Sequence, residues 1–318
     1  TTSSPPPSAG SGTGTWTVLN VPGAASTSIY GPEVLGNNTY NLVGTFTCPP
    51  SGSTSTTAAP SQCSTGANTY SFFYSGPITT NPSIGNFIQV QARQYPSLKL
   101  ADATILHSVS GGLAVGNYNS INGPMGNAFV FDPVTRKQTN LVFPDMEKSY
   151  SVYGIWYNGG TSYTVAGGVS GGLIDKKSGQ PVTLGYLMDY DRASGQSSNY
   201  QAYQYKPVGA AKRYFKHDGV ITHFEGIWSN GQGLYKLPAS ITSYTGGLSS
   251  AFVAQVVRRP NGKFSTSANW KQITLPGSSF MTNDSLFGDT SIGIVSYPAT
   301  AGDQSSVMSN FAVTHIKK

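Results

Sequence analysis

A segment that recurs at a spacing of 72 residues constrains the fold of this chain more than any other sequence feature. YSVYGIWYNGGTSY (150–163) and THFEGIWSNGQGLY (222–235) align without gaps and are identical at six positions, including the triplet Gly-Ile-Trp. A third copy, SIYGPEVLGNNTY (28–40), keeps the nine-residue step from Gly31 to Tyr40. In all three copies the Tyr begins an apolar run, which is typical of a turn that leads into a strand. Such periodicity indicates a repeat architecture.

A second pattern marks the ends of the repeated units. WTVLNVPG (16–23) and WKQITLPG (270–277) share the pattern W-x-x-(L/I)-x-(V/L)-P-G, and weaker relatives end at Pro96, Pro144 and Pro207. The five prolines at 22, 96, 144, 207 and 276 are separated by 74, 48, 63 and 69 residues, and a step of 64 residues through the chain ends closes the series. The chain therefore consists of five units.

A third element, an apolar run, lies between these two patterns. It occurs as YSFFYSGP (70–77), NAFVFDPVTRK (127–137), YLMDYDRASGQ (186–196), AFVAQVVRRPNGK (251–263) and NFAVTHIKK (310–318). Four of these runs continue into turn residues such as Asp-Pro, Ser-Gly or Asn-Gly, which favour hairpins. Each unit therefore predicts four short strands, as in a propeller blade.

The predicted fold is all-β, a five-bladed β-propeller of four-stranded blades over residues 15–318. The fifth unit lacks a fourth strand at its C-terminal end, and we expect Trp16–Val21 to pair into that blade and close the ring. A large sandwich with chance repetition and a six-bladed ring are the alternatives. The pattern resembles β-propeller repeats as an architecture and indicates no specific family. Five-bladed propellers include glycoside hydrolases (arabinanases and fructan-cleaving enzymes) and lectins of the tachylectin type, so the resemblance implies hydrolysis or binding of glycans.

The composition and the two cysteines indicate an extracellular, periplasmic or cell-surface protein. Charged residues make up only 10% of the chain, and the net charge of +6 comes from scattered basic residues, which does not favour nucleic-acid binding. Residues 1–14 predict a flexible Ser/Pro/Gly linker, either a mature N-terminus or a tether to a surface. Cys48 and Cys63 predict one disulfide in a surface loop, with two free thiols as the alternative. No apolar run is long enough to span a membrane.

The inner strand of each blade is expected to line a central channel, with the long loops between second and third strands gathered over its mouth. Aligned on the Gly of the repeat, the inner strands carry Tyr30, Tyr153, Glu225 and Phe287, with His107 in the second unit. Glu225 therefore replaces a repeated aromatic residue, and His223 lies on the same face of its strand. Burial beside aromatic rings is expected to raise the pKa of Glu225 toward that of a general acid. A bonded, purely structural carboxylate is the alternative.

A second set of acidic residues precedes the inner strands by a few positions, namely Asp102, Asp145, Glu147, Asp218 and Asp284. Carboxylates that converge from different blades are what a propeller glycosidase requires. Capping of turns at the rim is the alternative role of these acids.

The sequence thus predicts binding of a ligand, a glycan or another small extracellular molecule, through Tyr30, His107, Tyr153, His223 and Glu225. Whether the protein is an enzyme stays open. One alternative is a glycoside hydrolase or lyase that uses Asp102, Asp218, Glu225 and Asp284, and another is a protein–protein interaction scaffold. The dispersed His residues favour no metal site, and no cofactor motif is present. The sequence does not indicate the oligomeric state.

Overall fold

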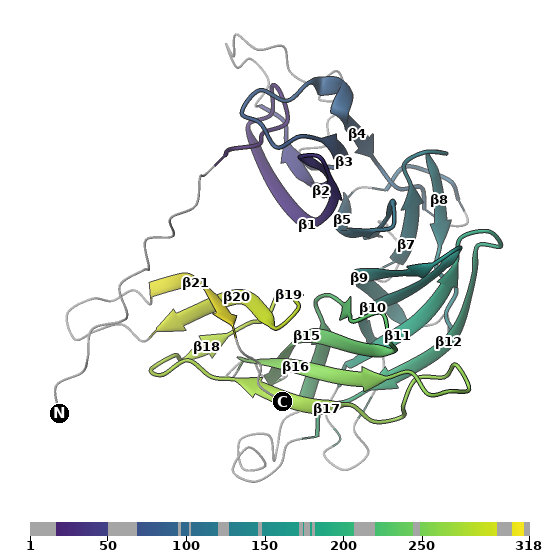
Figure 1. The fold of residues 1–318 in the computed structure, drawn as a ribbon, viewed down its shortest axis with the longest axis vertical. Helices are drawn as coiled ribbons and strands as arrows, with labels where there is room; N and C mark the ends of the chain where they lie inside the picture. Colours follow the sequence, from purple (N-terminus) through teal and green to yellow (C-terminus); the bar gives the residue numbers. More distant parts are fainter. Residues whose placement is uncertain are drawn as a thin grey trace, which may run out of the picture.

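The computed structural model describes most of the chain, with several gaps in loops. The described residues are 17–49, 69–94, 97–101, 103–119, 127–145, 148–171, 174, 179, 182–206, 220–243, 249–297 and 307–314. Five antiparallel sheets follow one another around a common centre, and in the first three sheets the first strand lies nearest that centre (Figure 1). The chain is therefore a five-bladed β-propeller of four-stranded blades, as the repeat pattern predicts.

The strands of each blade follow in chain order from the centre outward, apart from paired short strands in the last two blades. Blade 1 contains β1 (Ser26–Gly36), β2 (Thr39–Thr47), β3 (Thr69–Gly76) and β4 (Phe87–Val90), with a short 3-10 helix η2 (Ile84–Asn86) before β4. Blade 2 contains β5 (Ala103–Ser110), β6 (Leu113–Asn119), β7 (Asn127–Asp132) and β8 (Lys137–Asn140). Blade 3 contains β9 (Ser149–Gly159), β10 (Ser162–Ser170), β11 (Leu184–Asp191) and β12 (Gln196–Tyr203).

The inner strand is divided into two short strands in each of the last two blades. Blade 4 contains β13 (Val220–Phe224), β14 (Trp228–Ser229), β15 (Leu234–Ser243), β16 (Ser249–Val257) and β17 (Asn269–Ile273). Blade 5 contains β18 (Phe280–Met281), β19 (Ser285–Phe287), β20 (Thr290–Tyr297) and β21 (Val307–Thr314). Both β13 and β14 pair with β15, and both β18 and β19 pair with β20.

Two pairs of consecutive glycines form the tight turns between the first and second strands of blades 2 and 3. Gly111 and Gly112 connect β5 to β6 with φ of +57° and +74°, and Gly159 and Gly160 connect β9 to β10 with φ of +106° and +59°. Two successive residues with positive φ give a turn whose twist matches that of the flanking strands, and glycine adopts this conformation without steric cost.

The hydrophobic core consists of clusters packed between neighbouring blades. Val165 and Ala166 are consecutive residues of β10, yet Val165 belongs to the cluster shared with blade 2 and Ala166 to the cluster shared with blade 4. Successive side chains of a strand point to opposite faces, so a strand packed between two neighbouring blades contributes to both clusters. The middle strands are therefore rich in apolar residues, with a few buried polar groups such as Asn41 and Thr164.

The N-terminal segment differs from the sequence prediction. Residues 17–21 form no strand in the described part of the chain, and they do not pair with blade 5. Instead, Leu19 and Val21 are buried against Phe46 and Phe72 of blade 1. The apolar side chains of this segment thus cover an apolar face of blade 1. The predicted backbone pairing of Trp16–Val21 is not seen, and Trp16 lies outside the described residues.

Two further sequence predictions concern cysteines and membrane spans. Cys48 is half-buried beside the blade 1 core and is not a free thiol, while Cys63 lies outside the described residues, so their pairing stays a prediction. Within the described part of the chain, no helix has the length and apolar character needed to cross a bilayer.

Candidate functional site

The inner strands share one irregularity, which determines what faces the centre of the ring. In β5 the register shifts between Leu106 and Ser108, so His107 has no partner residue in β6. In β9 the shift falls at the same place and leaves Tyr153 without a partner in β10. A β-bulge of this kind turns one side chain out of the ladder and is common beside functional sites.

The other three blades are interrupted at the corresponding place. In β1 the shift follows Tyr30, and in blade 4 the inner strand breaks after β13, where the Glu225 N–H donates to the Pro238 carbonyl at 2.9 Å. In blade 5 the break between β18 and β19 leaves Asp284, whose N–H donates to the Ile292 carbonyl at 2.9 Å. The residues at or beside these interruptions, which we call the bulge positions of the five blades, are Tyr30, His107, Tyr153, Glu225 and Asp284.

The alignment of blade 5 made from the sequence is thus wrong. Phe287 was expected at the aligned position because a Gly follows it, as in the other repeats. In the structure Gly288 has a φ of +60° in the turn from β19 to β20, and the Phe287 side chain is 79% exposed. Gly31 packs on the His107 carbonyl of the next blade, and Gly226 lies in the same way beside the Asp284 carbonyl. Asp284, rather than Phe287, is the fifth member of the ring.

Side chains at and beside the bulge positions form a continuous belt from blade 1 to blade 4. The ring centroids of Tyr30 and His107 are 6.0 Å apart, and those of His107 and Tyr153 are 4.2 Å apart. Tyr153 then meets the ring of His223 edge to face at 4.5 Å. His223 Nδ1 lies 3.0 Å from Glu225 Oε1. The structure therefore brings together all five residues that the sequence predicts for ligand binding.

The His223 side chain contacts Ser151, Glu225 and Gly168, which fix its position. Its Nε2 lies 3.1 Å from Ser151 Oγ, opposite the bond to Glu225. Gly168 of β10 packs on the flat ring, because a Cβ at this position would lie 2.2 Å from His223 Cδ2. Ser151 and His223 are 72 residues apart, the offset of the repeat, so they occupy the same place in neighbouring blades. The ring of His223 consequently has a fixed orientation.

The charges in the belt differ from the sequence expectation. Burial alone would raise the pKa of Glu225, but the nearby His223 and the hydrogen bonds from His223 and Ser240 lower this pKa below its usual value. The prediction of a raised pKa is therefore wrong, because burial is outweighed by these partners. The pKa of His107 is lowered to about 4 by burial, and the pKa of Tyr153 is raised by burial and by the charge of Glu225. At neutral pH the belt holds one carboxylate and two neutral donors.

The pKa of Asp284 shifts in the opposite direction to that of Glu225. It is raised, first because neighbouring chain restricts hydration of the carboxylate and second because of the negative charge on Glu225, while a hydrogen bond from Thr282 opposes the shift. The two acids therefore lie close enough for their charges to interact, and their environments separate their pKa values.

A pocket of about 340 Å³ opens above the belt, and we call it the channel pocket. It lies among the inner strands and the adjacent ends of blades 2, 3 and 4, on the side toward the loops between second and third strands. This is the face on which the sequence predicts a ligand. The pocket is lined by Ile105, His107, Asn117, Asn119, Ser149, Ser151, Tyr153, Gly168, Val169, Ser170, Thr183, Ile221 and His223. Among the described residues that line the pocket there is no Lys, Arg, Asp or Glu.

Two of the five predicted acids, Asp145 and Asp284, lie among the described residues. Asp102, Glu147 and Asp218 lie outside the described residues. Asp145 pairs with Lys148 on the same turn, which agrees with the alternative role of a rim residue. Asp284 lies within the interrupted inner strand rather than before it. In the described part of the chain, no group of three or more His, Cys, Asp or Glu side chains is placed to hold a metal ion.

Sequence reasoning missed Ser151. Serine is abundant in this chain, and its one GxSxG match, residues 168–172, centres on Ser170 rather than on Ser151. The available signal was the 72-residue offset, which aligns Ser151 with His223.

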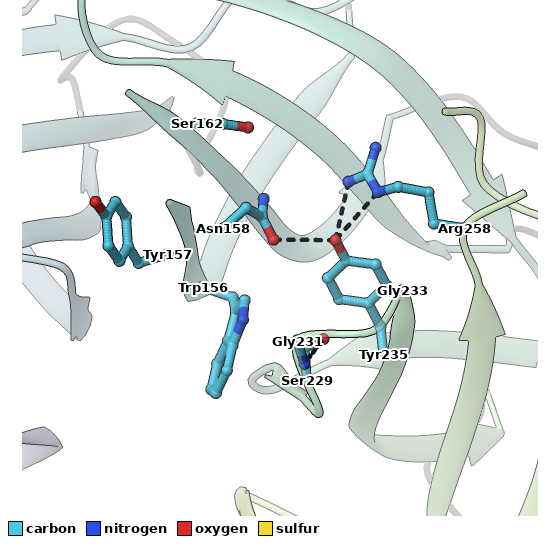
Figure 2. A pocket seen from close by; sticks show the side chains of 9 residues that line it. All are labelled: Trp156, Tyr157, Asn158, Ser162, Ser229, Gly231, Gly233, Tyr235 and Arg258. Atoms are coloured by element: carbon cyan, nitrogen blue, oxygen red, sulfur yellow. Dashed lines mark hydrogen bonds between the residues drawn. The ribbon is translucent and has the colours of Figure 1, made fainter. Parts of the chain in front are cut away.

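A second pocket, the inter-blade cavity, lies between blades 3 and 4 near the turns from first to second strands. It has a volume of about 320 Å³ and is lined by Trp156, Tyr157, Asn158, Ser162, Ser229, Gly231, Gly233, Tyr235 and Arg258. Figure 2 shows Trp156 and Tyr157 on one side of this cavity and Tyr235 and Arg258 on the other. The Tyr235 hydroxyl donates to Asn158 Oδ1 at 3.1 Å.

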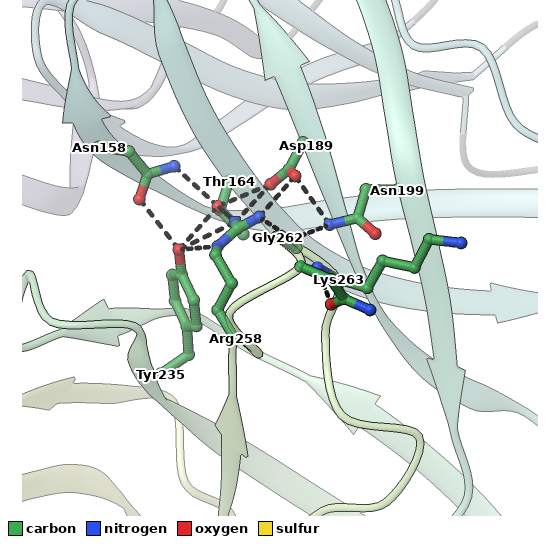
Figure 3. Close-up of polar contacts among 9 residues, drawn as sticks. Asn158, Thr164, Asp189, Asn199, Tyr235, Arg258, Gly262 and Lys263 are labelled. Atoms are coloured by element: carbon green, nitrogen blue, oxygen red, sulfur yellow. Dashed lines mark hydrogen bonds and ion pairs between the residues drawn. The ribbon is translucent and has the colours of Figure 1, made fainter.

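The polar groups of this cavity bind one another. Arg258 forms a two-pronged pair with Asp189 of blade 3, with Nη1–Oδ2 and Nη2–Oδ1 distances of 2.8 and 2.6 Å. The same guanidinium donates to Thr164 Oγ1 at 3.0 Å and to the Tyr235 hydroxyl at 3.0 Å, as Figure 3 shows. Its face rests on Phe264 at 4.4 Å. This network joins blades 3 and 4 and leaves no polar group of Arg258 directed at a ligand.

Comparisons with known proteins add little to this geometry. No family model matches the chain, and no curated protein matches it. Among solved structures, it is similar to an endo-arabinase from Bacteroides thetaiotaomicron, with 9% sequence identity, a TM-score of 0.43, and coverage of 95% of this chain and 98% of the other. A likeness of this degree carries no argument about function.

Proposed function

We propose that this propeller binds a neutral saccharide in the channel pocket. The observation that carries the proposal is the lining, which combines hydroxyl, amide and imidazole groups with the ring of Tyr153 and, among the described residues, includes no fully charged side chain. Sugar hydroxyls both donate and accept hydrogen bonds, and sugar rings also present apolar C–H faces. A phosphate or an amine would instead require an opposite charge in the lining, which the described residues do not offer.

The size of the pocket supports a small ligand or the end of a longer glycan. Ligand pockets usually measure about 300–1,000 Å³, and the channel pocket, with about 340 Å³, lies at the lower limit of this range. The neutral state of Tyr153 and His107 at neutral pH makes both available as donors to a sugar oxygen. A cell-surface or secreted location, with a Cys48–Cys63 disulfide, is part of the same proposal.

A glycan array with Tyr153→Phe tests this function. The variant keeps the ring but removes the hydroxyl, so we expect about a 2- to 10-fold loss of affinity, the effect of one hydrogen bond of about 0.5–1.5 kcal/mol. Tyr157→Phe is the matched control, because Tyr157 lies in the same strand but outside the channel pocket. Absence of saccharide binding by the wild-type protein on the array would contradict the proposal.

A second candidate is hydrolysis of a glycosidic bond by Glu225 and Asp284. The separation of their pKa values favours it, because such enzymes need one ionised and one protonated carboxyl group. A hydrolysis screen with the wild type, Glu225→Gln and Asp284→Asn tests this alternative. Saccharide binding without turnover by the wild-type protein would exclude it and leave the binding function intact.

A further inference from the structure

Three side chains in the centre of the ring stand in a line that the binding function does not require. Ser151 Oγ lies 3.1 Å from His223 Nε2, and His223 Nδ1 lies 3.0 Å from Glu225 Oε1. A hydroxyl, an imidazole and a carboxylate in this order form the arrangement that activates a serine nucleophile, and the arrangement is recognised by geometry rather than by sequence position. Ser151 and His223 both line the channel pocket, and Glu225 stands behind His223.

The ionisation of Glu225 determines where the protons of His223 and Ser151 lie. The lowered pKa of Glu225 keeps its carboxylate ionised at neutral pH, so this group only accepts hydrogen bonds. A neutral His223 must then place its proton on Nδ1, facing Glu225, and its Nε2 is left as an acceptor. The Ser151 hydroxyl therefore donates to Nε2 at 3.1 Å, while its other acceptor, the Gly168 carbonyl, lies farther away at 3.4 Å.

The surroundings hold this line in place and supply donors. Gly168 contacts the face of the His223 ring, and Tyr153 meets the ring at 4.5 Å, so the imidazole cannot turn away from Ser151. The Tyr153 hydroxyl and the His107 ring are neutral donors in the same pocket. Neutral donors beside a nucleophile are suited to stabilise the negative charge that develops on a carbonyl oxygen under attack.

We propose that Ser151 is the nucleophile of a carboxylic-ester hydrolase, with His223 as its general base and Glu225 as the residue that positions His223. The substrate class is an O-acylated polyhydroxylated alcohol. The identity of this alcohol rests on the proposed saccharide binding, whereas the acyl chemistry does not.

The reaction needs only the ester and water. Ser151 Oγ bonds to the ester carbonyl carbon as its proton passes to His223 Nε2, and the bond from that carbon to the alkoxy oxygen breaks. The leaving alkoxide takes the proton from His223, which releases the alcohol. A water molecule then gives a proton to His223 Nε2 while its oxygen bonds to the acyl carbon. The bond from that carbon to Ser151 Oγ breaks, Ser151 takes the proton back from His223, and the free acid departs.

Covalent labelling of the full-length protein with a fluorophosphonate tests the proposal without a saccharide. Intact-mass analysis should show a single adduct, and peptide mapping should locate it on Ser151. Ser151→Ala should abolish the adduct, while Ser162→Ala, an exposed serine away from the channel pocket, should label like the wild type. If Ser151→Ala does not fold, the peptide map of the wild-type adduct still decides the matter. No adduct, or an adduct on another residue, would overturn the proposal.

Hydrolysis of p-nitrophenyl acetate gives the second readout. We expect turnover by the wild type and a loss of roughly 10²-fold or more in Glu225→Gln, because the tautomer and orientation of His223 are then no longer fixed. The loss should fall on kcat with KM little changed, because Glu225 contacts His223 rather than the substrate, and Glu225→Asp should recover part of the rate, which a merely structural role would not predict. An unchanged rate in Glu225→Gln would overturn the positioning role.

Esterase activity without binding on the glycan array would contradict the proposed saccharide binding and support Ser151 as the nucleophile. Saccharide binding without esterase activity or labelling would contradict the role of Ser151 and support the binding function.

Discussion

The channel pocket and the inter-blade cavity are similar in volume, yet their polar groups end in different places. In the inter-blade cavity Arg258 binds Asp189, Thr164 and Tyr235, so its donors are used within the protein. In the channel pocket the hydrogen-bonded line from Glu225 ends at Ser151, whose hydroxyl borders open space. A polar lining by itself therefore does not identify a site. The informative feature is a chain of hydrogen bonds that ends at the pocket rather than within the protein.

The largest effect on stability should come from Arg258→Met, which tests whether the inter-blade cavity is purely structural. The change leaves the Asp189 carboxylate partly buried without its cationic partner, and we expect a loss of about 3 kcal/mol in the free energy of unfolding. Urea unfolding measures this loss. Labelling of Ser151 and saccharide binding by the folded variant should match the wild type, and a selective loss of either would show that the two regions are not independent.

Gly168→Ala should affect the channel pocket. The added Cβ would lie 2.2 Å from His223 Cδ2, so the imidazole must move away from Ser151. We expect loss of fluorophosphonate labelling together with roughly 1–3 kcal/mol of destabilisation from overpacking, measured by labelling and urea unfolding on one sample. Gly85→Ala is the control, because a Cβ there meets only Ser83 Oγ at 3.6 Å. Equal labelling in the two variants would contradict the proposed geometry.

Burial of neutral His107 predicts a pH-dependent stability. Its pKa falls from 6.5 to about 4 on folding, so between these values the unfolded chain binds a proton that the folded chain does not. The contribution of neutral His107 to the free energy of unfolding is therefore fully present above pH 6.5 and is lost as the pH falls toward 4. Between pH 7.5 and 5.0 this one group should cost about 2 kcal/mol, at 1.36 kcal/mol per pH unit.

Unfolding of the wild type and His107→Gln at both pH values measures this contribution. The loss between the two pH values should be smaller in the variant by that amount. An identical loss in both proteins would show that His107 is not held neutral.

The smallest effect is expected for Arg192→Met, the same change one blade earlier. Arg192 binds Asp132 of blade 2 at 2.8 Å, as Arg258 binds Asp189 of blade 3, but the Arg192 side chain is 37% exposed. Because solvent screens the exposed Arg192 end of this pair, urea unfolding should show a smaller loss than that of Arg258→Met. Comparable losses in the two variants would mean that exposure does not distinguish the pairs.

The blades could be predicted because their signals are local. The tight turn after the first strand and, in blades 1, 3 and 4, the Tyr at the start of the second strand recur at fixed spacing, and each acts within a single hairpin. The pairing of the N-terminal segment is not local. It depends on whether burial of Leu19 and Val21 against the apolar face of blade 1 stabilises the fold more than backbone pairing with blade 5 would. The spacing of residues in the sequence does not show which of the two is larger.

The candidate site could be predicted only where the repeat alignment holds. It gave His107, Tyr153, His223 and Glu225, because a Gly or a turn marks the position in their blades. It failed in blade 5, where the Phe287–Gly288 pair belongs to the turn and no glycine marks the bulge at Asp284. The pKa of Glu225 was not accessible either, since it depends on the orientation of His223 and Ser240 rather than on burial alone.

The bulge positions also have a consequence for engineering. His107 and Tyr153 are displaced from the ladder and have no cross-strand partner to match, and their side chains line the channel pocket. Codons 107 and 153 could therefore be randomised together in a library while the sheets keep their sequence. Such a library would exchange the chemistry of the centre one blade at a time, with the scaffold held constant.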